Sequence, residues 1–93
     1  MLNDNVFYTR NAVCHSYKLK PDTINEMVAW GIAEPSGNKP EKWLFTHEDF
    51  ERIGRATRFN NELEINVPGA ALALQLIEDL KNLRMRRVKD VSL

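Results

Sequence analysis

The sequence is poor in the residues and patterns that mark several classes of protein. Its one cysteine, Cys14, excludes a disulfide within the chain, which fits a reducing compartment. The longest apolar run, near residues 69–74, is far too short to cross a bilayer. The first ten residues lack the apolar core of a signal peptide. We therefore expect a cytoplasmic protein.

Excess charge of either sign is also absent. Thirteen basic and thirteen acidic residues give a net charge of zero, so no global field attracts nucleic acid or anionic lipid. What is present, 43% hydrophobic and 28% charged residues in a chain of 93, is typical of one globular domain. A chain of this length has a modest hydrophobic core.

The first half of the chain predicts two short helices. Asn11 is a candidate cap for the first. Pro21 suits the first turn of the second, over residues 21–30, although Lys20 before it is a poor cap. Gly31 is expected to end that helix.

A turn-rich segment follows the second helix. Residues 35–40, PSGNKP, cannot be helical, and short extended segments flank them at residues 32–34 and 43–45. We expect these two segments to pair as a small hairpin that packs on the helices. Trp30 and Trp43 are expected in the core or the hairpin packing, with a partner contact as the alternative.

Two longer helices are predicted in the second half. Thr46 and Asp49 form a capping-box pattern that begins a helix over residues 47–61. Asn66 and Pro68 begin another that reaches about residue 88, and its apolar residues surround most of its circumference. Such a helix must be covered on more than one side. We expect a homodimer through four residues at the spacing of a coiled-coil seam: Ala73, Leu76, Leu80 and Leu83.

The order of elements defines a fold class. Helix, turn, helix, two-stranded wing, helix and long helix give a mostly α chain that resembles a MerR-like winged helix-turn-helix. We assign residues 1–63 to that domain, and residues 64–93 to a C-terminal long helix for packing and dimerisation. DNA binding is the natural function of this outline, but the second helix carries Asp22 and Glu26 and no lysine or arginine. Because phosphate contacts depend on cations, we rank DNA binding second.

Groups for catalysis or metal binding are few. His47, Glu48 and Asp49 are consecutive on a helix and do not face one another, and the same holds for Cys14 and His15. We expect a solvated first turn and a buried structural cysteine at these places. We predict no enzymatic activity, no metal and no cofactor. A third interpretation is a dimerisation or adaptor domain that binds some other partner.

One ordered set of residues resembles a known family. Residues 62–69, with the pattern Glu-Leu-x-x-Asn-x-Pro-Gly, run into five apolar residues and then Leu-Ile-x-Asp-Leu at residues 76–80. Together with residues 24–35, with Trp43-Leu44-Phe45 and with residues 52–61, this set is similar to the chaperone-modulator CbpM family over roughly residues 7–85.

The resemblance implies a function. Members of that family are small cytoplasmic bacterial proteins with a MerR-like fold, which bind the J-domain of the DnaJ-like co-chaperone CbpA and restrain its stimulation of Hsp70. A J-domain carries a basic helix that docks on Hsp70. We therefore expect Asp22, Glu26 and Glu34, with an apolar contact at Ile32, to face that basic surface and mask it.

Two positions depart from the family pattern. Lys18 occupies the turn between the first two helices, where related sequences often use glycine, and Lys20-Pro21 replaces a serine-type cap. Both positions adjoin the predicted binding helix, so they bear directly on the shape of that surface.

Overall fold

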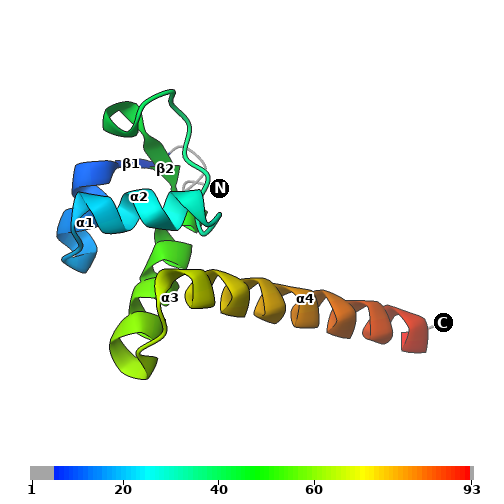
Figure 1. Ribbon diagram of the computed structural model, residues 1–93. Coiled ribbons are helices and arrows are strands. Elements are labelled where there is room, and N and C mark those ends of the chain that lie inside the picture. Colours follow the sequence, from blue (N-terminus) through cyan, green and yellow to red (C-terminus); the bar gives the residue numbers. More distant parts are fainter. Residues whose placement is uncertain (1–5, 93) are drawn as a thin grey trace.

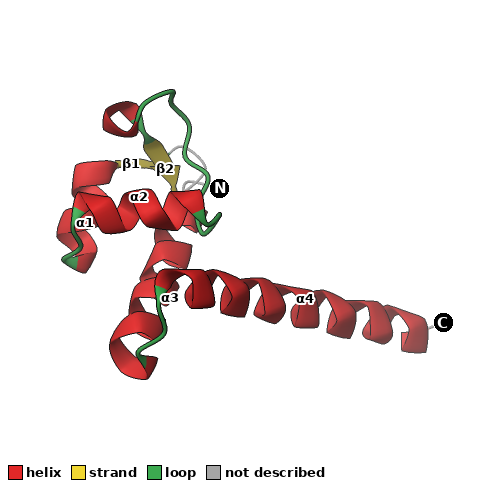
Figure 2. Cartoon of the chain, viewed as in Figure 1, coloured by secondary structure: helices red, strands yellow, loops and turns green. Residues whose placement is uncertain are grey.

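The computed structural model describes the backbone of residues 6–92 and the side chains of residues 6–86. Residues 1–5 and 93 of the two predicted domains lie outside that range. The elements, in chain order, are β1 (Phe7–Thr9), α1 (Arg10–Tyr17), α2 (Pro21–Ala29), a 3-10 turn (Pro40–Lys42), β2 (Leu44–Thr46), α3 (His47–Leu63) and α4 (Val67–Ser92). The chain is thus mostly helical, with one small antiparallel sheet (Figures 1 and 2), and the predicted fold class is confirmed.

The cap of α1 differs from the prediction. Thr9, not Asn11, precedes the helix, and its hydroxyl accepts a hydrogen bond from the backbone N–H of Ala12. The prediction failed because Thr9 ends a strand that the sequence analysis did not identify. At the other end, Lys18 adopts the left-handed conformation (φ 57°) that a glycine would adopt without strain.

α2 ends in a Schellman motif. Gly31, at φ 80°, donates its backbone N–H to the carbonyl of Val28, and Ile32 donates to the carbonyl of Met27. This motif brings an apolar residue after the glycine back onto the last helical turn. Met27 and Ile32 are accordingly both buried. At the start of α2, Lys20 makes no side-chain cap, as predicted.

The sheet pairs different segments from those predicted. β2 pairs antiparallel with β1, with Tyr8 opposite Phe45, and residues 32–34 form no strand. The predicted hairpin is therefore wrong, although residues 44–45 are extended as expected. An isolated bridge between Ser36 and Leu44 ties the turn-rich loop to β2. Residues 32–34 resembled a strand because Ile32 is apolar, but Ile32 is apolar because it packs against the last turn of α2.

Both long helices begin as predicted. The Thr46 hydroxyl accepts from the N–H of Asp49, and the Asp49 carboxylate accepts from the N–H of Thr46, which completes the capping box of α3. The Asn66 side chain accepts from the N–H of Gly69 in the first turn of α4. α3 runs two residues further than expected, to Leu63.

One core joins all the helices and the sheet. Its largest fully buried side chains are Phe45, Ile24, Met27, Ile32, Ile53, Leu74 and Val13. α4 supplies Ala70 and Leu74 to this core from its first two turns and then leaves the body, as Figure 1 shows. The proposed boundary at residues 63 and 64 therefore crosses a shared core, and only the later part of α4 stands apart.

Candidate protein-interaction site

α2 presents one exposed stripe opposite its buried face. Asp22, Glu26, Ala29 and Trp30 are exposed, and at about 100° per residue they fall within roughly 100° of the helix circumference. Ile24 and Met27 lie on the opposite side and are buried. α2 therefore exposes two carboxylates to solvent, followed by an aromatic ring at its C-terminal end.

Trp30 corrects one expectation from the sequence. Its side chain is 54% exposed, so it does not belong to the core. Trp43 behaves as predicted: it is half-buried and packs edge-on against Phe45, with ring centroids 6.0 Å apart. The two tryptophans therefore have different roles, and the one on α2 is available to a partner.

Ile32 corrects another expectation. Its side chain has no exposed surface, so it cannot supply the predicted apolar contact to a partner. Glu34, two residues later, is exposed, and its backbone N–H is 3.3 Å from the Asp49 carboxylate. Of the four predicted partner-binding residues, three are therefore accessible to a partner and Ile32 is not: the accessible residues are Asp22, Glu26 and Glu34.

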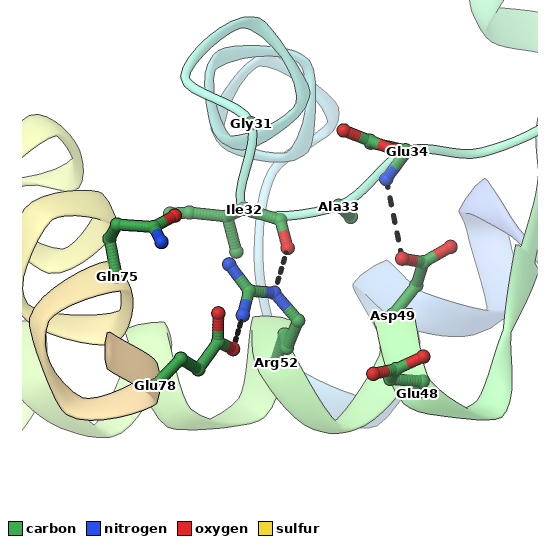
Figure 3. A pocket seen from close by; sticks show the side chains of 9 residues that line it. All are labelled: Gly31, Ile32, Ala33, Glu34, Glu48, Asp49, Arg52, Gln75 and Glu78. Atoms are coloured by element: carbon green, nitrogen blue, oxygen red, sulfur yellow. Dashed lines mark hydrogen bonds and ion pairs between the residues drawn. The ribbon is translucent and has the colours of Figure 1, made fainter. Parts of the chain in front are cut away.

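A shallow hollow of about 320 Å³ lies beside this segment (Figure 3). Arg52 of α3 crosses its floor, donating from Nε to the carbonyl of Ile32 at 2.7 Å and from a terminal nitrogen to Glu78 of α4. Glu48 and Asp49 lie along one side, as Figure 3 shows. The hollow is therefore lined by more carboxylates than cations, and it extends the acidic character of α2.

Arg52 and Glu78 were not identified from the sequence. They are 26 positions apart, and each also fits an ordinary exposed helix position in the sequence pattern. Together with the Ile32 carbonyl, they tie the segment after α2, the second turn of α3 and the fourth turn of α4 to one another. The arginine therefore links α4 to the segment that follows the α2 stripe.

α4 presents a second, purely apolar stripe. Leu76, Leu80 and Leu83 are 58%, 51% and 54% exposed, whereas Ala73 is half-buried. Leu72 extends the stripe toward the body. The core-facing residues Ala70 and Leu74 lie on roughly the opposite side of the helix. Among the described residues, the three leucines of the predicted seam thus share one exposed face, with the half-buried Ala73 at its edge, and their role in dimerisation stays a prediction.

His47 and Cys14 have different surroundings. His47 accepts from or donates to the Tyr8 hydroxyl through Nδ1 at 3.0 Å, and its Nε2 is 3.3 Å from Glu51. Cys14 is half-buried rather than fully buried, and burial raises the pKa of its thiol. A raised pKa keeps the thiol protonated and unreactive at neutral pH.

Among residues whose placement is described, no three His, Cys, Asp or Glu side chains gather to hold a metal ion. No helix within that same part of the chain is long and apolar enough to cross a membrane.

Comparison with known proteins gives consistent matches. A family model described as MerR HTH family regulatory protein matches residues 8–90. The Chaperone modulatory protein CbpM of Pseudomonas entomophila is 39% identical over 72 residues, covering 77% of this chain and 71% of the relative. The protein of the same name from Pseudomonas putida has the same identity and coverage. The one from Coxiella burnetii is 38% identical over 68 residues, covering 73% of this chain and 64% of the relative.

Proposed function

This chain belongs to the chaperone modulatory protein CbpM family of MerR-type helix-turn-helix proteins, and we propose that it modulates a chaperone by binding the J-domain of a CbpA-like co-chaperone. It acts in the cytoplasm as a binding protein rather than an enzyme. By covering the basic surface of the J-domain, it prevents that surface from reaching Hsp70.

The observation that carries this proposal is the acidic stripe of α2. Asp22 and Glu26 are exposed on the helix that reads DNA in helix-turn-helix proteins, and α2 contains no lysine or arginine. Glu34 adds a third exposed carboxylate beyond the turn. Such a surface repels phosphates and attracts a basic protein surface, so it favours a J-domain over DNA.

A second copy of the chain is the proposed occupant of the α4 stripe. The stripe formed by Ala73, Leu76, Leu80 and Leu83 carries no charge along its length, and a two-fold pairing satisfies it with an identical surface. The functional unit is then a homodimer with two acidic stripes.

The test is a calorimetric titration of the protein with the J-domain of a CbpA-like co-chaperone. We expect saturable binding, near one site per protomer, that weakens as salt rises. The charge-reversed variant Asp22→Lys with Glu26→Lys should bind at least about tenfold more weakly, since like charges then face each other.

The matched control is Glu51→Lys with Glu62→Lys. It changes the net charge by the same amount, at two exposed positions on α3. Asn60 marks the side of α3 that borders α2, and the two substituted positions lie roughly 200° around the helix from it, so they face away from α2. We expect it to bind like the wild type. Equal binding by the α2 variant would reject the assigned surface, and binding of duplex DNA in place of the J-domain would favour the regulator function.

A further inference from the structure

We infer that Trp30 is the anchor of the partner interface, and that its indole takes a cationic side chain from a basic helix of the partner. This inference rests on the proposed function and names the residue on which tight binding depends. Trp30 is 54% exposed at the end of α2 and is not among the side chains packed on the core. An exposed tryptophan on a polar helix face is the kind of residue that dominates interface energetics.

The surroundings of Trp30 specify the chemistry of its occupant. Glu26 precedes it by four positions and Asp22 by eight, so the two carboxylates and the ring form one row along α2. Glu34 is exposed just beyond the turn at Gly31. An arginine or lysine placed on the indole is attracted by its π-face, while its charge lies close to the carboxylates. An apolar partner would leave those carboxylates desolvated without a counter-charge.

The fold fixes the backbone from which Trp30 projects and leaves its side chain exposed. The backbone N–H of Trp30 donates to the carbonyl of Glu26 at 3.0 Å. The hydrogen bonds of Gly31 and Ile32 in the Schellman motif fix the backbone after it. Ile32 turns into the core and Trp30 remains outside. The anchor is therefore presented from a rigid helix end, which reduces the entropy lost on binding.

The experiment measures the kinetics and affinity of a CbpA-type J-domain for three variants. Trp30→Ala should weaken binding by about 30-fold, mainly through faster dissociation, with association within about threefold of wild type. Asp22→Lys with Glu26→Lys should act in the opposite manner: it should slow association, and added salt should no longer slow association further. Leu63→Ala, which truncates a comparably exposed apolar side chain (62%) at the end of α3, should bind within about twofold of wild type.

Fluorescence gives a second readout. In Trp43→Phe, Trp30 is the sole tryptophan, and its emission should shift and saturate in step with the calorimetric binding curve. Trp30→Ala binding within about threefold of wild type, or unchanged Trp30 emission at saturation, would overturn the anchor and leave the proposed function intact. Wild-type protein that binds no J-domain would overturn the proposed function and the anchor together.

Discussion

Gly54 shows how one missing side chain lets two helices approach. A Cβ placed there would lie 2.5 Å from the Tyr17 hydroxyl oxygen and 2.8 Å from its ring carbon. That hydroxyl donates to the carbonyl of Phe50 at 2.9 Å, and the Phe50 ring stacks on Tyr8 with centroids 4.2 Å apart. The glycine thus makes room for the contact between α1 and α3.

Gly54→Ala should destabilise the protein, against the usual trend for a glycine within a helix. Helix propensity alone would raise the free energy of unfolding by about 1 kcal/mol. The clash with Tyr17 should exceed that gain by about 1–3 kcal/mol, so the variant should be less stable. Urea denaturation measures the free energy of unfolding. Asn61→Ala, at an exposed position of the same helix, is the control and should be neutral or slightly stabilising. A more stable Gly54→Ala variant would show that the Tyr17 contact yields easily.

Trp30 and Ile32 show where prediction from single residues reached its limit. Both are large and apolar. Trp30 was predicted to be buried and Ile32 to be exposed, whereas in the structure Trp30 is exposed and Ile32 is buried. The signal was available, because a glycine at the end of a helix followed by an apolar residue predicts a Schellman motif with that residue packed inward. The caps at Thr46 and Asn66 were predicted correctly because each depends on residues only three apart.

Among the elements, the strands were harder to predict than the helices. α2, α3 and α4 follow from local periodicity, caps and a proline in the first turn. β1 has three residues, and its partner β2 lies 37 positions away for the pair Tyr8 and Phe45. No local pattern specifies such a pairing, so the sequence favoured the nearer segment at residues 32–34.

The Arg52 side chain helps to attach α4 to the body through its bonds to Glu78 and to the Ile32 carbonyl. Arg52→Met should leave the Glu78 carboxylate and the Ile32 carbonyl without their partner and reduce the free energy of unfolding by about 1–2 kcal/mol. The Arg52 and Glu78 side chains are 17% and 38% exposed, so water offsets part of the lost ion pair. Arg58→Met, at an exposed arginine of the same helix, should change stability by less than about 0.5 kcal/mol.

A double-mutant cycle isolates the ion pair from the rest of the arginine. The cycle compares Glu78→Gln, Arg52→Met and the double variant, and we expect a coupling free energy of about 0.5–1 kcal/mol. The reason is that Arg52→Met leaves an unpaired carboxylate in the wild-type background but not when residue 78 is already glutamine. A coupling of zero, measured by urea denaturation, would mean that Arg52 acts only through the Ile32 carbonyl.

At the scale of the molecule, one apolar face of α4 is exposed among the described residues. α4 packs Ala70 and Leu74 into the body and then projects beyond it (Figure 1), with leucines exposed on the other side. A monomer would hold this stripe in water, at a cost of about 25 cal/mol for each Å² of apolar surface. Pairing of two copies removes the cost and leaves the α2 stripes free, since the two stripes lie on different helices.

Leu76→Asp should therefore convert a dimer into a monomer. An unpaired carboxylate in the centre of the seam costs several kcal/mol to bury, so dimerisation should weaken by at least about 100-fold. Sedimentation velocity at micromolar concentration should show the wild type at twice the 10.8 kDa chain mass and the variant at the chain mass. Leu63→Asp, which adds the same charge at an exposed leucine outside the stripe, should remain dimeric. If the wild type itself sediments as a monomer, the stripe must be covered by another protein, and the same leucine substitutions would then weaken that complex instead.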